Sequence, residues 1–247
     1  MKAMILAAGL GTRLRPLTDT RPKSLVELSG RTLLEITLTR LCTFGVTEVI
    51  INVHHFADQV IDYLKSKSNF GLRIEISREE ILLDTGGGLK KASWFFLEGR
   101  KNLDEPFLLH NVDVISSIDF TRMLQFHNEH HALATLAVQS RDSSRQLLFN
   151  NDLQLSGRRA GRDQETEIVR PSPHLQPLAF SGIHLISPRL LPMLNEEGIF
   201  SIIPSYLRLS AQGEKILAFR ADDYYWRDLG RPADLAQATF DLQQRVL

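Results

Sequence analysis

Apolar runs and amphipathic segments alternate along the first half of the chain. Residues 3–8 (AMILAA) are apolar and stop at a glycine, which is typical of a short buried strand. Residues 32–44 carry apolar side chains at helical spacing, and Gly45 follows them as a helix-terminating glycine does. The same alternation predicts further strands at 48–53, 72–77, 106–114 and 132–139 and further helices at 56–67, 87–97 and 120–131.

The order of these elements predicts the fold class. Strands that alternate with helices of this length favour an α/β, Rossmann-like sheet, mixed but mostly parallel, with helices on both faces. Ligands of such sheets bind beyond the carboxyl ends of the strands. Polar or glycine-rich segments follow three of the predicted strands, after residue 8, at 53–55 and at 110–113. We therefore expect a ligand site at this edge of the sheet.

The second half of the chain has a different pattern. Residues 140–178 are rich in Arg, Ser, Gln and Pro, and we expect a hairpin that turns at Asn150 and Asn151. The residues beyond predict strands at 178–187 and 215–221 and two short helices within 188–212.

No repeat, low-complexity tract or linker divides the chain, so the sequence predicts a single domain over residues 1–247. This length accommodates one large α/β domain or two small ones. We expect a core at 1–139, a subregion at about 140–230 and a C-terminal helix at 231–247.

Composition narrows the range of partners. Lys and Arg (29) balance Asp and Glu (29), so the net charge is +0 and no global field attracts nucleic acid or a membrane. The single cysteine, Cys42, excludes an internal disulfide, and its amphipathic surroundings predict a buried thiol. The N-terminus resembles no signal segment, and 18 apolar residues never run together. We expect a cytoplasmic protein; the sequence indicates no oligomeric state.

The loop after the first predicted strand reads ILAAGLGTRLRPLT. Gly9 and Gly11 resemble a dinucleotide fingerprint, but Leu14 stands where the third glycine belongs. Pro16 then interrupts the helix that should follow, and no Gly-Lys-Ser/Thr completes a P-loop. These departures disfavour an NAD-dependent dehydrogenase.

Cations are spread along this loop instead. Arg13, Arg15, Arg21 and Lys23 lie within a short stretch that also holds two glycines. Glycine lets the backbone approach a phosphate, while guanidinium and ammonium groups neutralise its charge. The loop is therefore predicted to bind a polyphosphate.

Two further stretches carry candidate chemistry. Residues 82–92 (LLDTGGGLKKA) are a glycine cluster that opens a helix, where free N–H groups favour polar or anionic ligands. Residues 108–114 (LLHNVDV) deliver Asn111 and Asp113 to the end of a strand. Because Mg²⁺ binds one or two carboxylates together with phosphate oxygens, Asp113 is a candidate metal ligand. A turn or cap role for Asp113 is the alternative.

The opening loop resembles the signature of the sugar-1-phosphate nucleotidyltransferases, G-x-G-T-R-[LM]-x-P-x-T followed by P-K. The glycine cluster resembles the ETGGG version found in N-acetylmuramate-1-phosphate uridylyltransferases, and residues 224–235 (YYWRDLGRPADL) resemble the family's W-x-D-x-G-x-P segment. The residues that match the loop signature are Gly9, Gly11, Thr12, Arg13, Leu14, Pro16, Thr18, Pro22 and Lys23.

This resemblance implies a role for each matched segment. Arg13 would hold the departing pyrophosphate and Lys23 would align the phosphates, so that Arg13, Lys23 and Asp113 are the expected catalytic residues. Asp113 and Asp228 would bind Mg²⁺, although Val112 replaces the glycine of the family's N-G-D turn. The expected nucleotide contacts are Ala7, Ala8, Gly9, Gly11, Thr12, Arg13, Lys23, Thr85, Gly86 and Gly87.

The resemblance also implies that the 140–230 subregion faces a sugar. Many relatives bind the sugar phosphate with the lysine of an E-K-P motif, and the nearest match here is EIVRP, which ends in Arg170 and Pro171. The following stretch, AFSGIHLIS, matches the family's next strand. The expected sugar contacts are Asn111, Arg170, Ser181 and Gly182.

The implied reaction is attack by a sugar-1-phosphate oxygen on the α-phosphorus of a nucleoside triphosphate, with pyrophosphate leaving in line. Positioning and charge neutralisation dominate such transfers. The glycine cluster favours UTP with an N-acetylmuramate-type or hexose 1-phosphate as substrates. We expect the product to be used in the synthesis of cell-envelope polysaccharide. A mannose- or heptose-1-phosphate guanylyltransferase and a non-catalytic nucleotide-sugar sensor are the alternatives. The chain length leads us to expect no left-handed β-helix domain.

Overall fold

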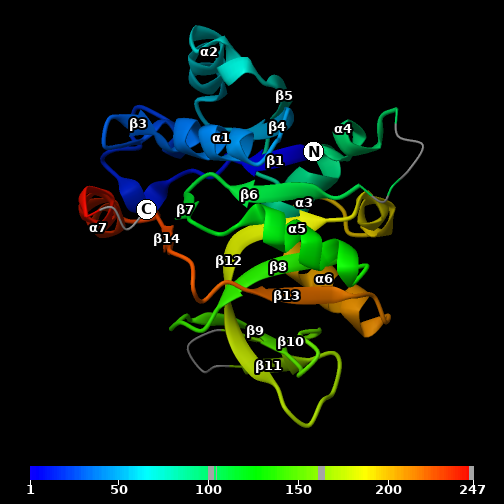
Figure 1. The fold of residues 1–247 in the computed structure, drawn as a ribbon. Coiled ribbons are helices and arrows are strands. Elements are labelled where there is room, and N and C mark those ends of the chain that lie inside the picture. The colour runs from blue at the N-terminus through cyan, green and yellow to red at the C-terminus, as the bar shows by residue number, and fades with distance from the viewer. Residues whose placement is uncertain (100–102, 104, 161–164, 245–247) are drawn as a thin grey trace.

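The computed structural model describes residues 1–99, 103, 105–160 and 165–244. Within this part of the chain, ten strands form one sheet (Figure 1). They are β1 (Lys2–Leu6), β4 (Glu48–Val53), β5 (Arg73–Arg78), β6 (Phe107–Asn111), β8 (Ala134–Gln139), β9 (Arg145–Phe149), β10 (Leu155–Ala160), β11 (Glu165–Ile168), β12 (Gln176–Ile186) and β13 (Ile216–Arg220).

The sheet has a parallel part and an antiparallel part. Along the order β11-β10-β9-β12-β6-β1-β4-β5, the last four strands run parallel to one another. The long strand β12 is antiparallel to β6, β8 and β9, and β13 is parallel to β8. The predicted mixed α/β sheet is confirmed. Because β12 pairs with β6, the sheet continues from the predicted core into the predicted subregion.

Helices cover both faces of the sheet, as the alternation of elements predicted (Figure 1). Ala3 and Ile5 of β1 pack into the cluster on one face, and Met4 between them packs into the cluster on the other. No helix in the described part of the chain is long and apolar enough to cross a bilayer. The first face carries α1 (Leu33–Thr43), α2 (Ala57–Ser66) and α5 (Phe120–Glu129), and the second carries α3 (Asp84–Lys91), α4 (Ser93–Leu97) and α6 (Ile202–Ala211).

Short elements surround the carboxyl edge of the sheet. A third apolar cluster joins Leu14 of the opening loop to Ile115, Leu229 and Leu235, and so fixes the loop against distant segments. The small elements are η1 (Thr12–Leu14), η2 (Lys23–Leu25), β2 (Glu27–Leu28), β3 (Arg31–Thr32), η3 (Ser68–Gly71), β7 (Val114–Ser116), η4 (Pro188–Met193), β14 (Trp226–Asp228) and α7 (Pro232–Gln243).

Several boundaries differ from the predictions. The expected strand 106–114 divides into β6 and β7, with a turn at 112–113 between them. The hairpin at Asn150 and Asn151 is confirmed, because β9 and β10 pair antiparallel around it. The C-terminal helix ends at Gln243, and the predicted helical residues 245–247 lie outside the described residues.

The prediction that Cys42 is buried is wrong, because its side chain is exposed. The buried arc of α1 contains Leu34, Leu38 and Leu41. At 100° per residue, Cys42 falls just beyond that arc, so the amphipathic pattern placed it on the wrong side of the boundary.

Candidate active site

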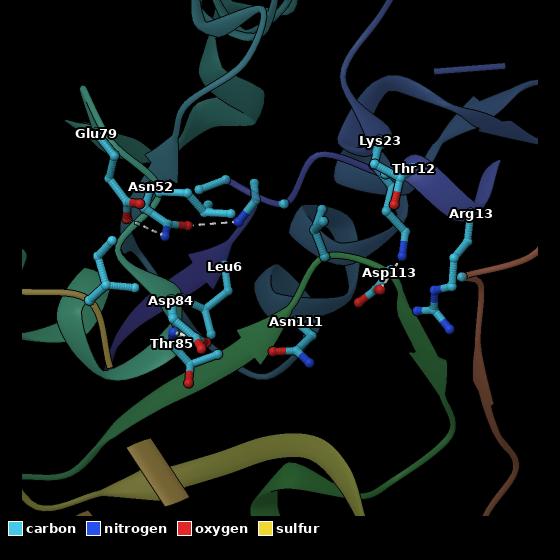
Figure 2. A pocket seen from close by; sticks show the side chains of 18 residues that line it. Leu6, Thr12, Arg13, Lys23, Asn52, Glu79, Asp84, Thr85, Asn111 and Asp113 are labelled. Atoms are coloured by element: carbon cyan, nitrogen blue, oxygen red, sulfur yellow. Dashed lines mark hydrogen bonds and ion pairs between the residues drawn. The ribbon is translucent and has the colours of Figure 1, made fainter. Parts of the chain in front are cut away.

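A cavity of about 510 Å³ opens where β1, β4 and β6 end, at the edge of the sheet predicted from the element order (Figure 2). The loop after β1 supplies much of its wall. The lining residues are Leu6, Ala7, Ala8, Gly9, Gly11, Thr12, Arg13, Lys23, Asn52, Glu79, Leu82, Asp84, Thr85, Asn111, Val112, Asp113, Ile199 and Gly230.

The loop after β1 folds back on itself around Gly11. This residue has φ +65°, a conformation that favours glycine, and a Cβ there would lie 2.9 Å from Thr18 Cγ2 and 3.1 Å from Lys23 Cβ. The Thr18 hydroxyl donates to the Gly11 carbonyl at 2.9 Å. The side chain of Leu14 is fully buried and anchors the loop. The loop therefore brings Lys23, which is twelve residues further along the chain, to the wall of the cavity.

One end of the cavity is charged. The Lys23 ammonium donates to Asp113 Oδ2, and only 8% of Lys23 is exposed. Arg13 Nη2 lies 3.9 Å from Asp228 Oδ1, and a Cβ on Gly230 would come within 2.5 Å of that same nitrogen. Gly230 is therefore needed for the arginine to lie beside the aspartate.

Strand pairing brings Asp113 and Asp228 together. In the β7–β14 pair Asp228 lies opposite Val114, and the Leu229 N–H donates to the Asp113 carbonyl at 2.7 Å. Burial, and secondly the nearby Asp113 carboxylate, raise the pKa of Asp228, while Lys23 and Arg13 oppose this rise. The two carboxylates are thus close enough to feel each other's charge.

These two carboxylates suit a divalent cation that also binds a substrate. No group of three or more His, Cys, Asp or Glu side chains among the described residues could enclose a metal ion alone. Mg²⁺ commonly takes one or two carboxylates and completes its shell with phosphate oxygens and water. The donor set of Asp113 and Asp228 fits that mode of binding.

The opposite end of the cavity is polar and carries two residues that sequence reasoning missed (Figure 2). Asn52 Oδ1 accepts the Ala7 N–H at 2.7 Å, and Asn52 Nδ2 donates to Glu79 Oε1 at 2.8 Å. Asn52 is the one polar residue in the apolar run VIINV (residues 49–53), which is a signal that could have found it. Glu79 follows its strand without a comparable pattern.

The glycine cluster reaches the cavity only in part. Thr85 lines it, and its hydroxyl accepts the Ile202 N–H at 3.0 Å. The N–H groups of Gly86 and Gly87 instead both donate to the Phe200 carbonyl, at 2.9 and 3.1 Å. Both glycines are buried, and a Cβ on Gly86 would overlap the Phe200 ring. Neither glycine lines the cavity, and both hold the segment before α6, so their nucleotide contact stays a prediction.

The predicted sugar contacts are also divided. Asn111 lines the cavity. Gly182 has φ +73° and packs behind Asn111, because a Cβ there would lie 2.7 Å from Asn111 Nδ2. Ser181 is fully buried, and Arg170 is exposed with its N–H donating to the Ser156 carbonyl at 3.0 Å. Of the four residues, the structure brings only Asn111 to the cavity wall.

A glycine-bearing cationic loop beside paired carboxylates, at the carboxyl edge of an α/β sheet, suits a transferase that binds a nucleotide. Residues 2–147 match the sequence model of the nucleotidyl transferase family, and the chain belongs to this family. The prediction of a nucleotidyltransferase enzyme is confirmed.

Individual relatives agree with this assignment. The chain is 34% identical over 240 residues to the N-acetylmuramate alpha-1-phosphate uridylyltransferase of Caulobacter vibrioides, covering 93% of this chain and 92% of the relative. It is 30% identical over 245 residues to a mannose-1-phosphate guanyltransferase of Candida albicans, covering 97% of this chain but only 64% of that relative. Its fold is similar to that of a putative glucose-1-phosphate thymidylyltransferase from Bacillus anthracis, with TM-score 0.79, 18% identity and coverage of 97% and 94%.

Proposed function

We propose that this enzyme transfers a nucleoside monophosphate from a nucleoside triphosphate to a sugar 1-phosphate and releases pyrophosphate. The observation that carries the proposal is that Arg13, Lys23 and Asp113 meet at one end of a cavity of about 510 Å³, with Asp228 beside Arg13. Two cations and two carboxylates close together suit a phosphoryl-type transfer, because the cations can stabilise the negative charge of the phosphates and the carboxylates can hold a metal ion.

The side chains in the cavity would act by position and charge. A sugar-phosphate oxygen is already ionised near neutral pH, so its attack on the α-phosphorus needs no general base. The new phosphorus–oxygen bond forms as the bond to the β-phosphate oxygen breaks, and the electron pair leaves with pyrophosphate. Arg13 faces the charge that develops there, and Lys23 aligns the phosphates.

Asp113 and Asp228 would hold Mg²⁺, which when bound neutralises phosphate charge. Burial, and secondly the neighbouring Asp113 carboxylate, raise the pKa of Asp228, and a cation bound between the two carboxylates would offset both effects. Leu229 and Val114 keep the two aspartates adjacent through the β7–β14 pairing.

The proposed substrates are UTP and N-acetylmuramate 1-phosphate. The uridylyltransferase of Caulobacter vibrioides supports this choice, because the similarity extends over 92% of its length. A guanylyltransferase is the second candidate, supported by 30% identity to the Candida albicans enzyme. We also propose a cytoplasmic location, in keeping with the single cysteine.

The test is pyrophosphate release by the purified protein with each nucleoside triphosphate, a panel of sugar 1-phosphates and Mg²⁺. We expect the highest kcat/KM with UTP and N-acetylmuramate 1-phosphate, and no release when Mg²⁺ is chelated. Preference for GTP with mannose 1-phosphate would establish the second candidate. Nucleotide binding without release from any pair would contradict catalysis and indicate a sensor.

A further inference from the structure

A buried chain of hydrogen bonds joins two walls of the nucleotide cavity (Figure 2). It starts at the Ala7 N–H, in the first residue after β1, which donates to Asn52 Oδ1 at 2.7 Å. Asn52 Nδ2 donates to Glu79 Oε1 at 2.8 Å, and the Leu83 N–H donates to Glu79 Oε2 at 2.9 Å. The phosphate loop follows Ala7, and α3 follows Leu83.

This chain of bonds is enclosed and tightly packed. Only 3% of Asn52 and 2% of Glu79 are exposed. A Cβ on Gly88 would lie 2.8 Å from Glu79 Oε1 and 2.9 Å from Asn52 Nδ2, so neither side chain has room to move towards α3. Glu79 makes no ion pair with any described residue, and its two oxygens depend on these N–H donors. Burying a carboxylate in this way costs free energy of desolvation, whereas two apolar side chains in place of Asn52 and Glu79 would not incur that cost.

The chemistry of the two side chains allows one arrangement. A carboxylate only accepts, so Glu79 accepts at one oxygen from Leu83 and at the other from the Asn52 amide nitrogen. The amide oxygen of Asn52 must then point the other way, at Ala7. Glu79 therefore sets the orientation of Asn52, and Asn52 holds the start of the phosphate loop.

We infer that Asn52 and Glu79 are positioning residues that set the distance between the phosphate loop and the Asp84–Thr85 end of the cavity. The inference rests on the proposed function, since it assumes that one nucleotide spans both ends. Neither residue takes part in bond making. A misplacement of about 1 Å in a site of this kind costs about a hundredfold in rate, which is why a rigid link between the two ends has value.

Exchanging the two functional groups tests this inference. In Glu79→Gln, the new amide nitrogen must face either Asn52 Nδ2 or the Leu83 N–H, and both are donors. In Asn52→Asp, two carboxylates face each other. In the double variant every group is again matched: the new aspartate accepts from Ala7 and from the new glutamine, whose oxygen accepts from Leu83.

We expect each single variant to raise KM for the nucleoside triphosphate and to lower kcat/KM by about tenfold or more. The double variant should return to within about threefold of the wild type. The control is Gln154→Leu, which removes a buried amide bonded to Ser210 Oγ at 2.8 Å, away from the cavity. It should lower the unfolding temperature and leave KM unchanged.

Single variants that fold and keep the wild-type KM and kcat would overturn the inference, as would a double variant that does not recover. Should a single variant fail to fold, the folded double variant decides, because only matched groups restore its kcat/KM. Calorimetric binding of the nucleoside triphosphate gives a second readout. If the wild type binds nucleotide but transfers it to no sugar phosphate, the proposed function fails, and the affinities of the variants still test the positioning role.

Discussion

The proposed phosphate side and the proposed sugar side of this enzyme are built in different ways. On the phosphate side, residues 7–9 and 11–13 line the cavity, and Lys23 joins them from the same loop. On the sugar side, Arg170 is exposed and Ser181 lies fully buried behind the wall. The local signature of the loop thus predicts residues that line the cavity. The motifs that contain Arg170 and Ser181 do not, because neither residue lines it.

The difference follows from how each region is folded. The phosphate loop makes its contacts within about twenty residues, through Gly11, Thr18 and Lys23. The sugar side depends on β12, which pairs with three strands from different parts of the chain. Residue spacing predicts contacts of the first kind and carries little information about the second.

The largest expected effect comes from Arg13→Ala, which removes the cation that we propose to face the leaving pyrophosphate. Loss of one such group from a preorganised site costs about a hundredfold to a thousandfold in kcat. Arg15→Ala is the matched control, because Arg15 is exposed and pairs with Asp19 at 3.3 Å, outside the cavity lining. Steady-state pyrophosphate release measures kcat for both variants. Equal losses of kcat would contradict the distinction between Arg13, which lines the cavity, and Arg15, which does not.

Asp228→Asn should lower turnover by about a hundredfold while leaving the protein at least as stable as the wild type. The pKa of Asp228 is raised in the folded state, chiefly by burial, so the ionised carboxyl opposes folding above that pKa. In the wild type the Gly230 N–H donates to Asp228 Oδ1 at 2.7 Å, and the oxygen of the asparagine can accept the same bond. Thermal unfolding at pH 7 provides the check. A large fall in the unfolding temperature would show that Asp228 is structural rather than functional.

Acid should lower the free energy of unfolding through two buried histidines at the seam between the two regions. This seam is the pairing of β6 with β12, which carry His110 and His184. Burial lowers the pKa of His110 from 6.5 to about 4 and that of His184 to about 3. Below pH 6.5 these histidines take up protons in the unfolded chain but stay neutral in the folded chain. The stability that is present above pH 6.5 is therefore lost as the pH falls. For a shift like that of His110 the loss is on the order of 3 kcal/mol by pH 4.

Urea unfolding between pH 7 and pH 5 measures this loss. His184→Gln removes one of the two titrating groups on the seam, and the glutamine can still meet the Tyr206 hydroxyl that His184 contacts at 2.8 Å. The variant should therefore lose less stability over this range than the wild type. Parallel stability curves would show that His184 does not contribute.

The smallest effect is expected for Arg170→Ala, with KM for the sugar phosphate changing by less than about threefold, as for an exposed charge. Arg170 lies outside the cavity lining, and its backbone rather than its side chain makes the recorded bond to Ser156. A tenfold rise in KM for the sugar phosphate alone would break the comparison, because it would place Arg170 at the substrate after all.

The sequence by itself determined the α/β class, most strands and helices, and the loop that carries Gly9, Gly11, Arg13 and Lys23. These are local properties: apolar periodicity reports which face of an element is buried, and glycine with cations reports where a phosphate can approach. The family resemblance also predicted that Asp113 and Asp228 act together, although they lie 115 positions apart in the chain.

Only the tertiary structure decided how distant segments meet. The β7–β14 pairing places Asp228 beside Asp113, and Phe200 occupies the N–H groups of Gly86 and Gly87. The buried link through Asn52 and Glu79 likewise depends on two strand ends that lie side by side. Each of these contacts depends on packing between segments far apart in sequence, and periodicity within one segment does not encode that packing.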